Sequence, residues 1–136
     1  MIKTILLDAG GVLYLNNGGK GYVNPPLLRF IQKNQDRYIF GVISMTQYDL
    51  ENILAQDNIR QLFDIVLTTG KENLDKTNPE IYQLALKQLH SSAEEAIFID
   101  NYEEYVQVAE KAGIKSILYT TFEKLESRLR ALGINV

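Results

Sequence analysis

Short apolar segments alternate along the chain with longer segments in which apolar residues recur at helical spacing. Five short segments rich in Ile, Val and Leu are predicted to be strands: 2–7, 38–43, 65–67, 96–99 and 116–119. Five helical segments lie between or after them: 25–35, 48–56, 79–89, 103–112 and 122–132. Strands that alternate with helices favour a parallel sheet. The pattern therefore predicts an α/β fold with a Rossmann-like, five-stranded parallel sheet and helices on both faces.

Chain length and composition limit the number of domains. The 136 residues are 46% hydrophobic and 23% charged, which is enough for one domain with a sizeable core. We therefore expect a single domain over residues 1–136. The Asn- and Gly-rich segment 16–21 is expected to be a flexible loop within this domain.

The charge balance and the absence of cysteine exclude several classes of function. The net charge is −3 and the 14 Lys and Arg residues are scattered, so neither a nucleic acid nor an anionic membrane is expected as a partner. The chain contains no Cys, which excludes disulfides, zinc sites built on thiolates and a cysteine nucleophile. Asp8 interrupts the first apolar run too early for a signal peptide, and no apolar segment has the length of a membrane span. We expect a soluble, cytoplasmic protein.

Polar side chains stand where several predicted strands end. Asp8 follows the first strand, Ser44 the second, and Asp100 and Asn101 the fourth, while Lys76 precedes the third helical segment. Any one of them is explained by the preference of strand-to-helix turns for capping residues. Together they favour a binding site, because the carboxyl ends of parallel strands meet at one edge of the sheet and ligands bind there.

Four sequence motifs occur in order around these residues. They read LLDAGGVLY, FGVISMT, DKTNPEIYQLAL and AIFIDNYEEYVQVAEKAGI. In these motifs the chain resembles the haloacid dehalogenase (HAD) superfamily of aspartate-nucleophile phosphatases and related enzymes, and the resemblance spans nearly the whole chain. It implies a HAD-like α/β core, a phosphate ester as the substrate and Mg²⁺ as the cofactor.

The resemblance implies a role for each matching residue. Asp8 is the nucleophile, Ser44 holds the phosphoryl group through its hydroxyl, and Lys76 neutralises it, so these three form the catalytic set. A carboxylate aimed at phosphorus forms an acyl phosphate that water hydrolyses. Lys71 also follows the third strand, but the spacing of Lys76 to Pro79 fits the motif better. The residues implied to bind phosphate are Gly10, Gly11, Ser44, Met45 and Lys76, with the two glycines offering backbone N–H groups.

The same resemblance implies a magnesium site. Its ligands would be Asp8, the backbone carbonyl of Gly10, and Asp100 or Asn101, all of which offer hard oxygen atoms. Asn101 stands where the family normally has a second carboxylate, and a neutral amide weakens magnesium binding. Gly10 stands where the family usually has an aspartate that acts as general acid and base, a loss worth about 10²- to 10⁴-fold in rate.

The segment between the first and second predicted strands leaves no room for a cap domain. It holds only one loop and one helix, so the site is expected to lie open. An open site suits a phosphorylated small molecule or an exposed phosphate on a larger substrate. The loop at 13–24 or a second subunit of an oligomer could then cover it.

Four tyrosines lie close to these motifs in the sequence. Tyr102 and Tyr105 flank the start of the helix at 103–112, and their rings either stack on a substrate or pack, with packing the expected use. Tyr14 and Tyr22 flank the glycine-rich loop and could form a small lid.

The sequence leaves alternatives open. The leading hypothesis is a Mg²⁺-dependent phosphatase with an aspartyl-phosphate intermediate. The main alternative, favoured by Gly10 and Asn101, is a non-catalytic member of the family that binds a phosphorylated ligand or a protein partner. Metal-free dehalogenation also remains as an alternative. It would leave Asp8 and Asp100 close together without a cation, and the repulsion between two carboxylates raises the pKa of one of them. A phospho-receiver domain would need its phosphoacceptor Asp after the third strand, where the chain reads LTTG.

Overall fold

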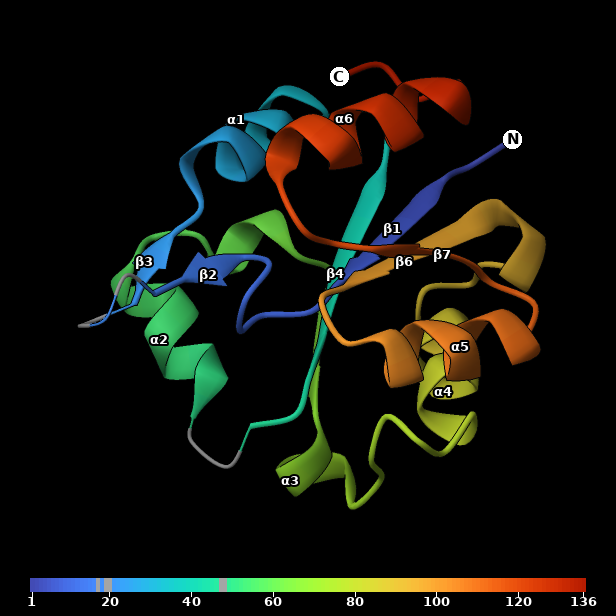
Figure 1. The fold of residues 1–136 in the computed structure, drawn as a ribbon. Coiled ribbons are helices and arrows are strands. Elements are labelled where there is room, and N and C mark those ends of the chain that lie inside the picture. The colour runs from blue at the N-terminus through green and yellow to red at the C-terminus, as the bar shows by residue number, and fades with distance from the viewer. Residues whose placement is uncertain (17, 19–20, 47–48) are drawn as a thin grey trace.

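The computed structural model describes residues 1–16, 18, 21–46 and 49–136, and its centre is a five-stranded parallel sheet. The strands are β1 (Thr4–Leu7), β4 (Ile39–Ser44), β5 (Ile65–Thr68), β6 (Ala96–Asp100) and β7 (Lys115–Leu118). Their order is β5-β4-β1-β6-β7, which places β1 in the middle (Figure 1). The predicted parallel sheet is confirmed, and each strand differs from its predicted bounds by no more than two residues.

Five helices match the predicted ones: α1 (Pro25–Lys33), α2 (Leu50–Gln56), α4 (Glu80–Gln88), α5 (Glu103–Lys111) and α6 (Phe122–Ala131). Asp49 caps α2 by accepting a hydrogen bond from the N–H of Asn52, while the predicted start at residue 48 lies outside the described residues. One further helix, α3 (Thr69–Glu72), and two 3-10 turns, Arg60–Leu62 and Ala93–Glu95, are additional to the prediction, because a single turn is too short to show periodicity. No helix in the described part of the chain is long and apolar enough to cross a membrane.

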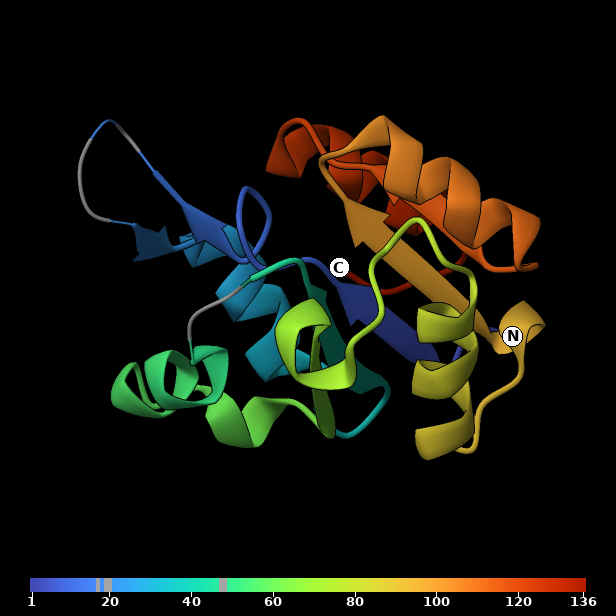
Figure 2. The same cartoon turned by 90° about the horizontal axis from the view of Figure 1, so that it is seen from below.

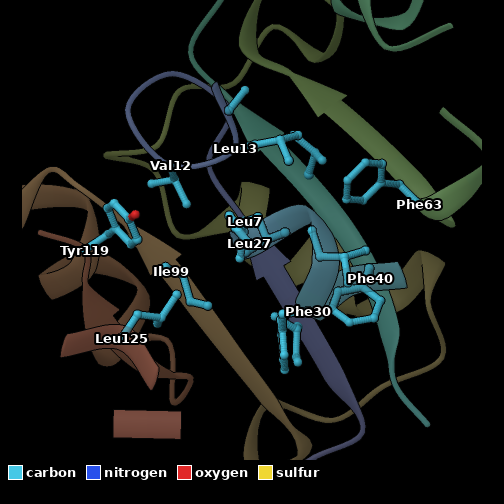
Figure 3. Packing of buried hydrophobic residues seen from close by; sticks show 14 of the residues in the cluster. Leu7, Val12, Leu13, Leu27, Phe30, Phe40, Phe63, Ile99, Tyr119 and Leu125 are labelled. Atoms are coloured by element: carbon cyan, nitrogen blue, oxygen red, sulfur yellow. The ribbon is translucent and has the colours of Figure 1, made fainter. Parts of the chain in front are cut away.

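Helices cover both faces of the sheet, and the strands are accordingly apolar on both sides. On β1, Ile5 and Leu7 belong to the core beneath α1, α2 and α6, whereas Leu6 belongs to the core beneath α4 and α5. Figure 1 shows α1 and α6 on one side of the sheet and α4 and α5 on the other. Figure 3 shows Leu7 and Ile99 of neighbouring strands within the first of these cores. Because β1 is packed on both faces, a residue at its carboxyl end is held in a fixed position.

The segment expected to be a loop, residues 13–24, folds instead into a short hairpin. Its strands β2 (Tyr14–Leu15) and β3 (Tyr22–Val23) pair antiparallel, with Tyr14 opposite Val23. Tyr and Val favour strands, but strands of two residues are too short for an apolar pattern to reveal. The expected flexible loop at 16–21 lies partly outside the described residues. The hairpin and α1 are the only described elements between β1 and β4, so the residues described there form no cap domain.

Buried Asn24 fixes this hairpin to the sheet. Its side-chain amide donates to the carbonyl of Val12 at 2.9 Å and to the hydroxyl of Tyr119 at 2.8 Å. Its backbone N–H donates to the carbonyl of Leu13 at 2.8 Å. Tyr119 directly follows β7, so the base of the hairpin is tied to the carboxyl edge of the sheet.

Candidate active site

Three strands end in a polar residue at the same edge of the sheet. Asp8 follows β1, Ser44 is the last residue of β4, and Asp100 is the last residue of β6. Lys76 reaches this edge from the segment between α3 and α4. A hollow of about 160 Å³ opens there, and it is lined by every residue of the predicted site except Gly11, together with two tyrosines.

The centre of the hollow is a lysine held between two acids. Lys76 Nζ donates to Asp8 Oδ1 at 2.6 Å and to Asp100 Oδ2 at 2.8 Å. All three side chains are almost completely buried, so their charges are poorly screened by water. Lys76 therefore supplies the cation that the two acids were expected to lack without a metal. One cation between two acids still leaves one negative charge uncompensated.

Aromatic residues hold Lys76 in this position. The hydroxyl of Tyr82 donates to the backbone carbonyl of Lys76 at 2.8 Å. The Lys76 ammonium lies 5.3 Å from the ring centre of Tyr105 and 5.6 Å from that of Phe98, within the range of cation–π attraction. Lys71, the other candidate, lies on α3 and lines a separate hollow. Of the two lysines, Lys76 is the one that contacts the acids.

Burial changes the acidity of Asp8. It raises the pKa of Asp8 to about 6, while the Lys76 ammonium opposes this shift and the Asp100 carboxylate adds to it. The carboxyl group is thus still ionised at neutral pH. A carboxylate that is charged yet poorly solvated is typical of functional sites.

Ser44 supplies a hydroxyl to the same hollow. The residue is 4% exposed, and its hydroxyl forms no hydrogen bond with the residues that the structure describes. Among the described residues no buried side-chain oxygen or nitrogen atom lacks a partner, so the Ser44 hydroxyl oxygen is itself accessible in the hollow and can donate a hydrogen bond to a ligand there. The neighbouring Met45 is 46% exposed and forms part of the rim.

Asn101 turns its amide toward three oxygen atoms of the site. Hydrogen bonding favours the orientation of the amide in which Nδ2 faces these oxygens, and Nδ2 then donates to Asp8 Oδ2 at 3.1 Å, to Asp100 Oδ1 at 3.2 Å and to the carbonyl of Gly10 at 3.3 Å. These oxygens belong to two carboxylates and one backbone carbonyl, which are the hard donors that Mg²⁺ prefers. Since they converge on one point, they fit a divalent cation in type and arrangement. The amide nitrogen takes that point here.

Gly11 makes room for this amide. Its φ is +84°, and a Cβ atom on it would lie 2.7 Å from Asn101 Cγ, so a side chain would strain the backbone and displace Asn101. The N–H of Gly11 donates to the carbonyl of Tyr14 at 2.8 Å. The prediction that Gly11 binds phosphate through its N–H would require this hydrogen bond to break, and Gly11 does not line the hollow.

Gly10 differs from Gly11 in having space around it. A Cβ atom at Gly10 would meet no other atom within 4 Å, and its φ lies outside the left-handed range. A side chain is therefore tolerated at position 10, where the family that the sequence resembles usually has an aspartate.

Two tyrosines of the lining were expected to pack rather than to face a ligand. The rings of Tyr102 and Tyr105 lie 4.7 Å apart with 37° between their planes, and Tyr102 is 53% exposed. Both line the hollow. Their position in the sequence could have indicated that they line the site. Helix α5 begins directly after Asp100 and Asn101, so its first residues lie over the carboxyl edge of the sheet.

One family model matches most of the chain. It is described as haloacid dehalogenase-like hydrolase, and it matches residues 27–119. A curated relative, acyl-CoA dehydrogenase family member 10 of Mus musculus, is 36% identical over 82 residues. The match takes in 60% of this chain and 8% of that protein, so the chain spans a small part of the relative's length.

Solved structures share the fold over nearly the full chain. A predicted HAD-like family hydrolase from Porphyromonas gingivalis has a TM-score of 0.80 at 16% identity, with 100% of each chain covered. A HAD family enzyme from Bacteroides thetaiotaomicron, in complex with magnesium and inorganic phosphate, has a TM-score of 0.75 at 16% identity. There the likeness covers 88% of this chain and 95% of that chain. At these identities the similarity concerns the fold.

Proposed function

The chain belongs to the haloacid dehalogenase-like hydrolase family, and we propose that it hydrolyses phosphate monoesters, with Asp8 as the nucleophile and an aspartyl-phosphate as the intermediate. The observation that carries this proposal is a buried, ionised carboxylate and an unpartnered hydroxyl in one hollow, Asp8 on one strand end and Ser44 on the next. A phosphoryl group between them would meet a nucleophile and a hydrogen-bond donor. The phosphate complex of the Bacteroides enzyme supports the same substrate class.

The proposed reaction begins when a carboxylate oxygen of Asp8 attacks phosphorus. The bond from Asp8 to phosphorus forms as the bond from phosphorus to the leaving oxygen breaks, and water then cleaves the acyl phosphate, which returns the carboxylate and releases inorganic phosphate. Lys76, 2.6 Å from Asp8 Oδ1, orients the carboxylate and neutralises part of the phosphoryl charge. Ser44 donates to a phosphoryl oxygen.

The negative charge left in the site favours a divalent cation before a phosphate dianion enters. Asp8, Asp100 and the carbonyl of Gly10 would hold Mg²⁺, and Asn101 would join them through its carbonyl oxygen once its amide is turned around. When bound, the cation supplies positive charge that stabilises the phosphoryl oxygens. Because an amide stands in place of a carboxylate, we expect the affinity for Mg²⁺ to be low.

Position 10 determines the expected rate. The acids among the described lining residues are Asp8 and Asp100, and both contact Lys76, so neither is free to protonate a leaving group. Loss of a general acid typically lowers the rate by about 10²- to 10⁴-fold, and the loss is smaller for a phenol, which leaves with little protonation. Aryl phosphates should therefore be hydrolysed faster than alkyl phosphates.

Release of inorganic phosphate from phenyl phosphate, with and without Mg²⁺, tests the proposal. The wild type should be slow and should require Mg²⁺. A Gly10→Asp, Asn101→Asp double variant restores both acids, and the space at Gly10 permits it, so it should be at least about tenfold faster. Asp8→Asn is nearly isosteric and should be inactive while it remains folded by circular dichroism.

Two results would contradict the proposal. One is an Asp8→Asn variant with the activity of the wild type. The other is a double variant that is folded but inert, like the wild type, on a panel of aryl and alkyl phosphates.

A second candidate function is favoured by the Asn101 amide. With Nδ2 facing them, this amide donates hydrogen bonds to oxygens of Asp8, Asp100 and Gly10, so these oxygens have a partner even without a cation. The chain would then bind a phosphorylated ligand or a protein partner without turnover. In that case inorganic phosphate binds the wild type, and no ester is hydrolysed with or without Mg²⁺.

A further inference from the structure

A second and larger hollow lies beside the site, between the hairpin β2–β3 and α2. Its volume is about 690 Å³, within the range of pockets that bind small molecules. Figures 1 and 2 show the hairpin and α2 on the same side of the molecule. This hairpin–helix pocket is lined mainly by five apolar or aromatic side chains: Tyr14, Tyr22, Val23, Leu50 and Ile53.

The hairpin–helix pocket meets the active-site hollow at Gly10. Gly10 lines both of them, and because it has no side chain, it places no barrier between the two. A group attached to a phosphate beside Asp8 would reach the pocket at Gly10.

The walls of the pocket are fixed at both ends. The hydroxyl of Tyr14 donates to Asp57 Oδ2 at 2.6 Å, which joins the hairpin to the residue that follows α2. At the other end, Asn24 ties the base of the hairpin to Val12 and Tyr119. A preformed pocket loses little conformational entropy when a ligand enters it.

The lining of the pocket selects against charged groups. Among the described residues that line it there is no Lys, Arg or His, and its carboxylate, Asp57, already accepts a hydrogen bond from Tyr14. A second phosphate or a carboxylate would find no cation among the described residues of this lining. Val23 and Ile53 offer apolar surface, and the ring of Tyr22, which is 42% exposed, offers a face for stacking.

We infer that the hairpin–helix pocket holds the leaving group of the substrate, and that this group is an uncharged, apolar alcohol or phenol. The inference rests on the proposed hydrolysis of phosphate esters at Asp8 and narrows its substrate class. Esters with a second anionic group, such as diphosphates and phosphorylated carboxylic acids, are poor substrates on this view.

Binding of two non-hydrolysable phosphonates tests the inference without turnover. In the presence of Mg²⁺, the wild type should bind benzylphosphonate about tenfold more tightly than methylphosphonate, because the ring is removed from water. Tyr22→Ser and Ile53→Glu should each bring this ratio toward one and leave methylphosphonate binding unchanged. Leu118→Ser is the matched control, since Leu118 is a comparably exposed apolar residue on β7 outside both hollows, and it should keep the ratio.

Three results would overturn the inference: equal affinity of the wild type for the two phosphonates, binding of neither, or a preference that survives both pocket variants. Retained methylphosphonate binding shows that Ile53→Glu is folded, and the exposed Tyr22 can be replaced without a loss of core packing. Failure of the proposed function looks different. If the protein prefers benzylphosphonate but hydrolyses neither phenyl phosphate nor methyl phosphate, the pocket binds the apolar group as inferred. In that case the proposed hydrolase activity is wrong.

Discussion

Strands β1 and β6 lie side by side, and a lysine pairs with one acid at the amino ends of these strands and with two acids at their carboxyl ends. At the amino ends, Lys3 precedes β1 and Glu95 precedes β6, and Lys3 Nζ lies 2.9 Å from Glu95 Oε2. At the carboxyl ends, Asp8 and Asp100 share Lys76 at 2.6 and 2.8 Å. The distances are similar, but the side chains of Lys3 and Glu95 are 62% and 29% exposed, whereas that of Lys76 is 1% exposed.

This difference in burial reverses the effect on acidity. Hydrogen bonds from Lys3 and Ser92 lower the pKa of Glu95 to about 2, as expected for an accessible acid with a cationic partner. Burial raises the pKa of Asp8 to about 6 although its lysine is equally close. The exposed pair therefore joins two strands, whereas the buried cluster keeps an acid whose negative charge a further cation would stabilise.

Of the variants that test this contrast in burial, Lys76→Met should have the largest effect on stability. It leaves two buried acids unpaired, and we expect the free energy of unfolding to fall by about 3–5 kcal/mol. The loss should be larger at pH 8 than at pH 5, because protonation of Asp8 relieves the repulsion from Asp100. Lys3→Met, the matched change at the exposed end, should have little effect. Urea denaturation at the two pH values measures the difference, and equal losses in the two variants would contradict our account of burial.

Asn101→Asp should sharpen the contrast by adding a third acid to the buried cluster. In EDTA the variant should be less stable than the wild type, because it replaces a hydrogen-bond donor with a negative charge. With Mg²⁺ at about 100 times its dissociation constant the variant should gain about 2.7 kcal/mol, whereas the wild type should gain much less at the same concentration. Thermal melting in EDTA and in Mg²⁺ compares the two. Identical shifts would show that the Asn101 amide does not control the affinity for the cation.

Asp8→Asn should stabilise the fold at neutral pH, although it should also abolish the proposed turnover. An acid whose pKa is raised from 3.8 to about 6 on folding destabilises the folded state above about pH 6, and this cost disappears as the pH falls below 3.8. In EDTA the variant should be more stable than the wild type by about 1 kcal/mol or more at pH 7. The difference should shrink toward pH 4. Denaturant titrations at the two pH values test it, and a variant that is less stable at pH 7 would refute this assignment.

Glu95→Gln should have the smallest effect, with the opposite dependence on pH. The pKa of Glu95 lies below its ordinary value of 4.5, so its contribution to stability is complete above pH 4.5 and is lost as the pH falls toward 2. Glu95 also accepts hydrogen bonds from the N–H and the hydroxyl of Ser92. The variant should melt slightly below the wild type at pH 7, and the two should converge in acid. Calorimetry measures the melting temperatures. If the difference between the variant and the wild type grows as the pH falls, the direction of the pH dependence that we assign to Glu95 is wrong.

The sheet and most of the site could be predicted from the sequence because they depend on local pattern. Strands β1 and β6 are buried on both faces, so they appear as continuous apolar runs. Asp8, Ser44 and Asp100 stand at strand ends, and parallel strands bring their carboxyl ends to one edge whatever the loops do. Lys76 could be chosen over Lys71 only through the spacing of a family motif.

Contacts between segments distant in sequence could not be predicted in this way. The strands of the hairpin are too short to show a pattern, and its position depends on the hydrogen bonds of Asn24. The N–H of Gly11 was expected to bind phosphate, and the turn that the chain makes pairs it with the carbonyl of Tyr14. The sequence places Asn101 beside Asp100, but only the fold shows that its amide lies over Gly11 and faces the oxygens of the site.

Trapping of the acyl phosphate tests the central claim, nucleophilic attack by Asp8, most directly. Borohydride reduces an acyl phosphate to an alcohol, so a borohydride quench during turnover of phenyl phosphate converts the attacked aspartate to homoserine. Mass spectrometry of the tryptic peptide over residues 4–20 then identifies the residue at position 8. We expect homoserine at this position when phenyl phosphate and Mg²⁺ are present, and aspartate when the ester is left out. Hydrolysis of phenyl phosphate with aspartate fully retained at position 8 would contradict the claim.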